Sequence, residues 1–253
     1  MACEVEVLFT PAEFHSLRER DLSRTTCVVF DVLRATSTII TALASGAEGI
    51  LPVSEISEAL DWRRRRPEVL LAGERGGLRI GADLAGGHEF DLGNSPREFT
   101  AARVAGRFIV TTTTNGTRAL RACAGAAEVV VGSFLNLSAT ARHLARQRSE
   151  AICLVCAGTG EFAALEDALA AGALCDRLKS TKLATDLQDS AAVAHGAFLQ
   201  ARQNLADAIN QASNARRLLS VPELHDDVGF CLRLDALELV AASDVNAAVR
   251  RLS

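Results

Sequence analysis

The sequence predicts a three-layer α/β/α protein with a largely parallel or mixed sheet and a helical C-terminal part. Five apolar, strand-like stretches run directly into small, polar or charged residues, as in VVFDVLRATST and FIVTTTTNGT. Helical segments separate most of these strands, and that alternation is typical of parallel sheets with right-handed crossovers. Ligands of such sheets bind beyond the carboxyl ends of the strands, so the polar residues there are predicted to share one crevice.

The first part of the chain alternates between short strands and helices. Pro11 suits the first turn of one helix, and Ile39, Ile40 and Leu43 form the apolar face of another. Ser54 is expected to cap a third helix. The expected strands are 4–9, 27–30 and 49–53, and the expected helices are 11–22, 36–47 and 54–65.

Four further strands follow, interrupted by helices and by one long loop. Residues 76–100 form a glycine-bearing loop, and loops of that length in compact domains are often functional. The expected strands are 69–73, 107–112, 128–132 and 150–157, and the expected helices are 117–123, 138–148 and 162–178.

The pattern changes after Lys179. Two alanine-rich helices are expected at 183–202 and 204–219, and a strand at 228–234. No flexible linker, repeat or low-complexity tract is visible. We therefore expect one domain over 1–253, in which 1–178 and 179–253 are possible lobes.

Composition and charge limit the partners of the protein. Hydrophobic residues make up 49% and charged residues 23%, no apolar run approaches the roughly 18 residues of a membrane span, and the N-terminus does not resemble a signal peptide. These features predict a cytoplasmic protein with no membrane partner. The formal net charge of −4 argues against nucleic-acid binding through a general basic field. A homo-oligomer is left open.

The basic residues suit local anion binding. Of 27 basic residues only Lys179 and Lys182 are lysines. The planar arginine fork fits phosphate, carboxylate or sulfonate in a bidentate way, although compositional bias gives the same ratio. The seven cysteines are predicted to be reduced and buried, since the chain shows no secretion signal and they lie in apolar contexts.

One group of polar residues follows the strand at 27–30. Asp31 ends this strand, and Arg34, Thr36, Ser37 and Thr38 stand where the chain turns into a helix. Free backbone N–H groups and hydroxyls at a helix start favour an anion, although any single Ser or Thr there can be a helix cap alone. With Asp31 and Arg34 beside them, we favour a binding role.

Two more strand ends carry candidate residues. A run of four threonines leads into Asn115, Gly116 and Thr117. Threonine suits a strand in its own right, but the turn into a helix also suits binding. Glu74 and Arg75 end another strand, either as a charge pair at the crevice or as a surface ion pair.

Acidic residues stand at the beginning of the helix at 162–178. Glu161, Glu166 and Asp167 either complement the helix dipole or bind Mg²⁺, which takes one or two carboxylates together with waters and phosphate oxygens. Asp31 is placed to complete such a site from a neighbouring strand end.

Some enzyme classes are excluded and one rival remains. No cysteine has an arginine six positions later, as a cysteine phosphatase requires, and no GxxxxGK[ST] loop is present. Leu33 stands where a phosphoaspartate-forming phosphatase carries its second aspartate. Gly158, Gly160 and Ala163 form a G-x-G-x-x-A pattern, so a nicotinamide-dinucleotide-binding oxidoreductase stays a rival. That rival lacks a second strand ending in an acidic residue roughly 20 positions later.

Six motifs, in order along nearly the whole chain, resemble the 2-phosphosulfolactate phosphatase family. They are DVLRATST at 31–38, AGERGG at 72–77, FDLGNSP at 90–96, TTTNGT at 112–117, CAGTGEFAALEDALAAG at 156–172 and NARRL at 214–218. The fifth departs from a usual family spelling, with FAALED in place of FSLED.

The resemblance implies a Mg²⁺-dependent phosphatase that hydrolyses (R)-2-phospho-3-sulfolactate to 3-sulfolactate and phosphate, a step of coenzyme M biosynthesis. The resemblance leaves open a closely related small anionic phosphomonoester as the substrate. A noncatalytic sensor of an anionic metabolite is a third possibility. The candidate catalytic residues are Asp31, Arg34 and Glu74, the candidate metal ligands are Asp31, Glu166 and Asp167, and the candidate substrate-binding residues are Thr36, Ser37, Thr38, Arg75, Asn94, Ser95, Asn115, Gly116, Thr117 and Gly158.

Overall fold

The computed structural model describes residues 2–147, 149–183 and 185–252. Within them the strands form one 11-stranded, mostly parallel mixed sheet, which confirms the predicted α/β class. From edge to edge the strands are β5 (Leu78–Arg79), β4 (Leu70–Arg75), β6 (Phe108–Thr112), β3 (Gly49–Pro52), β11 (Val249–Arg251), β10 (Ala241–Ser243), β7 (Glu128–Gly132), β2 (Thr25–Phe30), β8 (Ala151–Cys156), β1 (Cys3–Leu8) and β9 (Thr185–Leu187).

A C-terminal hairpin joins two parallel parts of this sheet. β10 pairs with β7, β11 pairs with β3, and β10 pairs with β11, all antiparallel. By contrast, β4, β6 and β3 are parallel to one another, as are β7, β2, β8, β1 and β9. The two parallel parts therefore run in opposite directions on either side of the hairpin.

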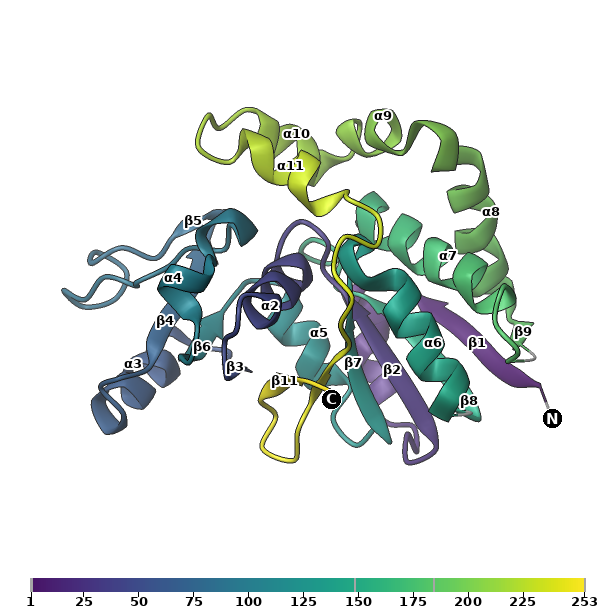
Figure 1. Ribbon diagram of the computed structural model, residues 1–253, viewed down its shortest axis with the longest axis horizontal. Coiled ribbons are helices and arrows are strands. Elements are labelled where there is room, and N and C mark those ends of the chain that lie inside the picture. The colour runs from purple at the N-terminus through teal and green to yellow at the C-terminus, as the bar shows by residue number, and fades with distance from the viewer. Residues whose placement is uncertain (1, 148, 184, 253) are drawn as a thin grey trace.

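Helices cover both faces of the sheet (Figure 1). They are α1 (Phe14–Arg18), α2 (Ala35–Ala44), α3 (Ile56–Arg65), α4 (Ala101–Val104), α5 (Gly116–Ala122), α6 (Leu137–Gln147), α7 (Leu165–Lys179), α8 (Asp189–Ala201), α9 (Leu205–Asn210), α10 (Ser213–Leu219) and α11 (His225–Cys231). Within the described residues, none of the helices combines the length and the apolar character that a membrane span requires.

Side-chain alternation along β2 separates two hydrophobic cores. Val28 and Phe30 pack with residues of α6, α7 and α8, whereas Cys27 and Val29 pack with residues of α1, α2 and α5. Successive side chains of a strand point to opposite faces, so one buried strand supplies both cores. A third cluster around Leu71 and Phe108 includes residues of α3. All seven cysteines are buried and free, as predicted.

Several expected elements are shorter than predicted. The helix expected at 11–22 is a 3₁₀ turn from Pro11 to Glu13 followed by α1, which ends at Arg18. Ser54 does not cap α3, because Glu55 is the N-cap residue and the Ser54 hydroxyl accepts a hydrogen bond from Arg121. The 76–100 loop contains β5 and a 3₁₀ turn, η2 (Pro96–Glu98).

The C-terminal part differs most from the prediction. The helix expected at 183–202 begins only at Asp189, after the edge strand β9, and the one expected at 204–219 is divided into α9 and α10. The strand expected at 228–234 is wrong, because α11 covers most of it. Apolar residues alternate there, but Val228 and Cys231, three apart, are the buried pair, which is the spacing of one helix face. Residues 148 and 184 of the expected helices lie outside the described residues.

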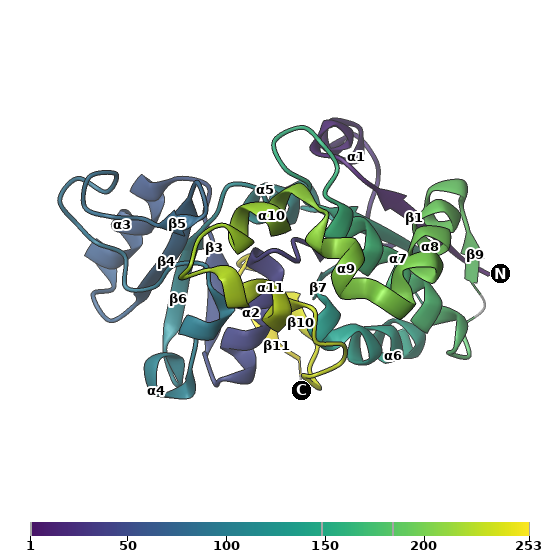
Figure 2. The same cartoon turned by 90° about the horizontal axis from the view of Figure 1, so that it is seen from above.

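The C-terminal helices cover one end of the sheet. Figures 1 and 2 show α11 lying over α2 with α10 beside α11, and α9 and α8 leading back toward α7. Close contact between α7 and α8 depends on Gly172, where a Cβ atom would stand 2.1 Å from the backbone oxygen of Ala194. We call α10 and α11 the cover helices.

Candidate active site

Four acidic side chains from three segments are buried beneath the cover helices. Asp31 follows β2 directly, Glu74 lies in β4, and Glu166 and Asp167 occupy the first turn of α7. Each is less than 10% exposed. Because charged groups lose water when they are buried, such a group of carboxylates is costly unless protons, donors or cations compensate it.

The carboxylate of Asp31 is fixed by the start of α2. The backbone N–H of Ala35 donates to its Oδ1 at 3.2 Å. The Thr36 hydroxyl donates to the backbone oxygen of Asp31 at 2.9 Å, and the N–H of Asp31 donates back to that hydroxyl. Burial, together with the nearby charges of Glu74 and Glu166, raises the pKa of Asp31 to about 7.

Asp167 bridges two strand ends. Its Oδ1 accepts the N–H of Val32 at 2.8 Å, and its Oδ2 accepts the N–H of Gly158 at 3.1 Å. Gly158 has a φ of +64°, a conformation that side chains other than glycine seldom adopt. Burial, followed by the charges of Glu166 and Asp31, holds the pKa of Asp167 well above its ordinary value.

Glu166 is contacted by a cover helix. Asn214 of α10 donates from Nδ2 to Glu166 Oε1 at 2.6 Å and to the Thr159 hydroxyl at 2.7 Å. Burial raises the pKa of Glu166. The second oxygen, Oε2, is buried without a hydrogen-bond partner among the described residues. A buried carboxylate oxygen of this kind calls for a cation or a donor from a ligand.

Glu74 holds two turns together at the end of the crevice. Its Oε2 accepts the N–H of Gly77 at 2.7 Å, and its Oε1 accepts both the N–H and the hydroxyl of Thr114 at 2.9 Å. The strand ends of β4 and β6 are thereby joined through one carboxylate. Glu74 also places a negative charge near Asp31, and this charge raises the pKa of Asp31.

Arg34 is the buried cation of the site. Its Nη1 donates to Asp227 of α11 at 2.7 Å, and its Nη2 donates to the backbone oxygen of Gly77. Its side chain is 3% exposed. Since an isolated buried charge is unfavourable, the Asp227 carboxylate compensates the guanidinium.

The hydroxyls at the start of α2 point into the fold. Ser37 donates to the backbone oxygen of Val32 at 2.8 Å, and Thr38 donates to that of Asn94 at 2.9 Å. Together with Thr36 they shape the loop that carries Asp31 and Arg34. In this arrangement their side-chain protons are engaged by the protein.

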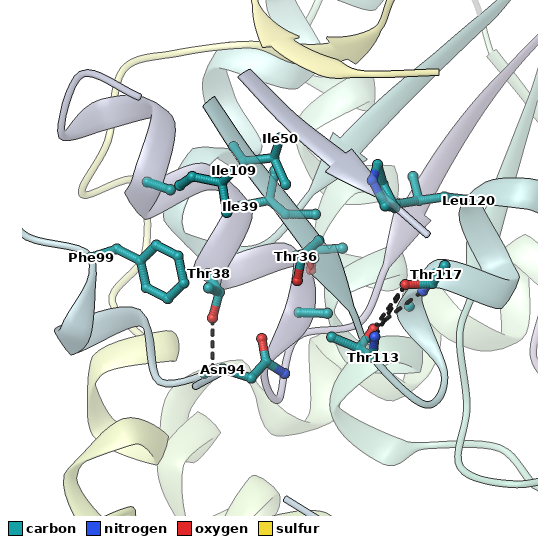
Figure 3. A pocket seen from close by; sticks show the side chains of 15 residues that line it. Thr36, Thr38, Ile39, Ile50, Asn94, Phe99, Ile109, Thr113, Thr117 and Leu120 are labelled. Carbon is teal, nitrogen blue, oxygen red and sulfur yellow. Dashed lines mark hydrogen bonds between the residues drawn. The ribbon is translucent and has the colours of Figure 1, made fainter. Parts of the chain in front are cut away.

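A narrow apolar cavity lies behind this loop (Figure 3). Its volume of about 10 Å³ gives room for roughly one water molecule, so it does not hold a substrate. Thr38 and Asn94 meet on one side of it, and Thr113 and Thr117 meet on the other with their hydroxyls 3.3 Å apart. Ile39, Ile50, Phe99, Ile109 and Leu120 supply most of its apolar lining.

The remaining predicted residues lie around the carboxylates or beside them. A Cβ atom on Gly116 would stand 2.8 Å from Asp31 Oδ2, so the glycine permits close approach there. Asn115 accepts the N–H of Gly160, and Ser95 donates to Asp227 at 2.7 Å. Arg75 contacts Ser54 and Thr112 rather than the acidic group.

The donor set fits a magnesium ion. Asp31, Glu166 and Asp167 present hard oxygen atoms, and the charge of Glu166 contributes to the raised pKa values of both Asp31 and Asp167. Among residues 2–147, 149–183 and 185–252, no group of three or more His, Cys, Asp and Glu side chains is arranged so that it could hold a metal ion by itself. Mg²⁺ commonly keeps several waters and uses one or two carboxylates together with phosphate oxygens, so a complete cage is not required.

Comparison with known proteins decides the family. The family model described as 2-phosphosulpholactate phosphatase matches residues 11–245. The chain belongs to the 2-phosphosulfolactate phosphatase family. Its membership places it among the phosphoric monoester hydrolases, as the motifs predicted.

Relatives in the 2-phosphosulfolactate phosphatase family match over most of their length. Three are named probable 2-phosphosulfolactate phosphatases. The protein of Caldanaerobacter subterraneus subsp. tengcongensis is 39% identical over 92% of this chain and 93% of its own length. That of Thermotoga petrophila is 42% identical over 85% and 87%, and that of Symbiobacterium thermophilum is 40% identical over 87% and 91%.

Three residues at the site were not among the sequence candidates. Asn214 lies in the NARRL motif, which was a usable signal. Asp227 directly precedes the segment 228–234 that the sequence suggested as a strand, and no motif marks it, so its position beside Arg34 was not predicted. Arg217 lies in the same motif as Asn214, three residues after it, and its Cζ is 3.9 Å from the position of a Cβ atom on Gly77.

Proposed function

We propose that the protein is a Mg²⁺-dependent phosphatase that hydrolyses (R)-2-phospho-3-sulfolactate, or a closely related small anionic phosphomonoester, to the hydroxy acid and phosphate. The observation that carries this proposal is the meeting of Asp31, Glu166 and Asp167 beneath the cover helices, with one oxygen of Glu166 unpartnered among the described residues. Family membership supplies the substrate class.

Asp31, Glu166 and Asp167 are the residues that would hold the ion. Mg²⁺, when bound, neutralises phosphoryl oxygens and the charge that develops on them. The carboxylates suit that ion because burial raises their pKa values, and a bound cation would stabilise the ionised forms that burial disfavours. Asp167 keeps its orientation through two backbone donors, so it is held ready in the folded chain.

The chain itself supplies orientation and charge stabilisation. Arg34 lies close enough to Asp31 for its charge to lower the pKa of that carboxyl. We propose that N–H groups of Arg34 not engaged by Asp227 or Gly77 stabilise the phosphoryl oxygens. In hydrolysis an oxygen nucleophile bonds to phosphorus, the phosphorus bond to the substrate's hydroxyl oxygen breaks, and that oxygen takes up a proton as it leaves.

A second cation near the crevice suits a substrate with several negative groups. Arg217 of α10 lies beside Gly77, and its charge acts on Glu166. Among the described residues, no carboxylate lies within ion-pair distance of Arg217, unlike Arg34, Arg97 and Arg118. We propose that its guanidinium receives the carboxylate or sulfonate of the substrate.

The structure favours the phosphatase over the oxidoreductase. Gly158 and Gly160 have φ values of +64° and +62°, but α7 starts only at Leu165, so the glycine loop does not run directly into a helix. The N–H of Gly158 is directed at Asp167 rather than left for a pyrophosphate. A dinucleotide-binding fingerprint needs a glycine loop that leads directly into a helix and backbone N–H groups free to bind the pyrophosphate.

Phosphate release by the purified protein tests the proposal. We expect turnover of 2-phospho-3-sulfolactate with Mg²⁺, loss of turnover in EDTA, and recovery when Mg²⁺ is restored. Asp31→Asn and Asp167→Asn should each lower kcat/KM by about 100-fold or more. Glu161→Gln is the matched control, because Glu161 is exposed and pairs with Arg118.

Near-normal turnover in both aspartate variants would remove the proposed roles. Binding of the phosphoester without release of phosphate would instead support the sensor. A panel of small phosphorylated hydroxy acids, assayed with and without Mg²⁺, identifies the preferred substrate within the class.

A further inference from the structure

Asp227 is a fully buried carboxylate at which three segments of the chain converge. Its Oδ2 accepts Nη1 of Arg34 at 2.7 Å. Its Oδ1 accepts the Ser95 hydroxyl at 2.7 Å and Nε of Arg97 at 2.8 Å. The side chain of Asp227 is 0% exposed, and its helix α11 reaches these partners from the cover. Each oxygen is therefore engaged by a named donor.

These contacts leave Arg34 little freedom. The Asp227 carboxylate holds one end of its guanidinium, and the backbone oxygen of Gly77 accepts from Nη2. The N–H of Gly77 is in turn held by Glu74, so a continuous chain of hydrogen bonds runs from β4 through Arg34 to α11. A guanidinium is planar, and two fixed contacts set the direction of its other N–H groups.

We propose that Asp227 is a positioning residue, which aims the remaining N–H groups of Arg34 at the phosphoryl group when α11 is seated. This inference rests on the proposed function and deepens it. It also assigns a role to a cover helix that the sequence motifs do not mark. Asp227 itself does not touch the substrate; it acts through Arg34.

The neighbouring residue Asp226 provides a matched control. It lies on the same helix, carries the same charge and contacts Nη1 of Arg97 at 3.3 Å, but it is exposed. A surface pair of this kind contributes little to stability. Asp226→Asn therefore removes an equal charge from α11 without disturbing Arg34.

The first measurement compares kcat and KM for the two substitutions. Asp227→Asn should lower kcat by about 10- to 100-fold, because a misplaced catalytic group loses about that much. Asp226→Asn should stay within about twofold of the wild type in both constants. Asp227→Glu, which keeps the charge, should recover part of the lost kcat.

A double-mutant cycle separates positioning from mere support of the fold. In an Arg34→Gln background, Asp227→Asn has nothing left to position, so it should lower kcat by less than about threefold further. An equal fold-loss in both backgrounds would overturn the proposal. The same cycle with Asp227→Glu is decisive if asparagine at 227 prevents folding.

Binding of inorganic phosphate gives a readout that needs no turnover. Titration calorimetry with Mg²⁺ compares the phosphate affinities of the wild type, Asp227→Asn, Arg34→Gln and the double variant. The losses of phosphate affinity should be non-additive, as for kcat. Additive losses would overturn the positioning role even if the wild type hydrolyses 2-phospho-3-sulfolactate. An inactive wild type with coupled losses would instead refute hydrolysis and retain the positioning role.

Discussion

Asn214 of α10 donates a hydrogen bond of 2.6 Å to the buried carboxylate of Glu166 at the start of α7. The same amide nitrogen also contacts the Thr159 hydroxyl. Residues 48 positions apart thus connect the cover helices to the acidic group. The cover helices are therefore part of the candidate active site as well as of the packing above it.

Removal of this amide should weaken both stability and activity. In Asn214→Ala the buried Oε1 of Glu166 loses its donor, which costs about 1–3 kcal/mol of unfolding free energy. We expect kcat/KM to fall at least about tenfold, because the carboxylate is no longer oriented. Urea unfolding and phosphate-release assays measure the two effects.

Ser213→Ala on the same helix is the control for this change, since Ser213 is exposed. It should leave both quantities near their wild-type values. Wild-type activity in Asn214→Ala would show that the hydrogen bond from Asn214 is not needed to orient Glu166.

Glu166→Gln should stabilise the metal-free protein. Because burial raises the pKa of Glu166, its ionised form disfavours the folded state, and a neutral amide relieves that effect. Relief of about 1 kcal/mol would raise Tm in EDTA by about 3 °C for a chain of this size. The increase in Tm on adding Mg²⁺ should shrink at the same time.

Thermal melts with and without Mg²⁺ measure the Tm in EDTA and the increase in Tm that Mg²⁺ causes. Glu161→Gln, at an exposed position beside Arg118, should change neither of them. A lower Tm for Glu166→Gln in EDTA would contradict the electrostatic explanation.

Gly116→Ala should disturb the site directly. The added methyl would stand 2.7 Å from Cβ of Ala35 and 2.8 Å from Oδ2 of Asp31, closer than real contacts allow. We expect a loss of about 1–3 kcal/mol of unfolding free energy, and an activity loss of about tenfold as Asp31 shifts.

The matched substitution is Gly196→Ala in α8. A Cβ atom there meets nothing within 4 Å. Alanine favours a helix over glycine by about 1 kcal/mol, so this variant should gain stability and keep its activity. If Gly116→Ala and Gly196→Ala had the same stability and activity, the clash at Gly116 would have to be relieved by shifts of neighbouring atoms.

Gly172→Ala tests the packing of α7 on α8. Its added Cβ would meet the backbone oxygen of Ala194 at 2.1 Å, and backbone cannot rotate away as a side chain can. The helices must separate, so we expect a loss of about 3 kcal/mol or more. Unfolding monitored by circular dichroism measures it, and a change below 1 kcal/mol would mean that the helices slide apart easily.

Part of the candidate site was accessible from the sequence. Acidic residues at the ends of strands and in the first turns of helices are a visible signal, and the four residues at such places are Asp31, Glu74, Glu166 and Asp167. The hydroxyls of Thr36, Ser37 and Thr38 were expected to face an anion, and the structure shows them donating to the backbone of the loop and of Asn94. Which way a hydroxyl donates depends on neighbours that the local sequence does not reveal.

The predicted fold is wrong where the local pattern of apolar residues fits both a strand and a helix. The segment 228–234 alternates apolar residues, yet α11 forms there because Asp227, Val228 and Cys231 all find buried partners on one face. Short apolar runs fit either period equally well, so packing decides between them. The strands β10 and β11 are three residues each, which is too short for a periodic signal.

The amino-acid sequence by itself determined the alternation of strands and helices, the family, and the acidic and glycine-rich turns at strand ends, because each of these depends on residues close together in the chain. Only the tertiary structure decided that the last hairpin joins two oppositely directed parts of the sheet, and that Asn214 and Asp227 reach the crevice from a helical cover. The physical reason is that these contacts join residues far apart in the chain. Burial and hydrogen bonding select them only when the whole chain is folded.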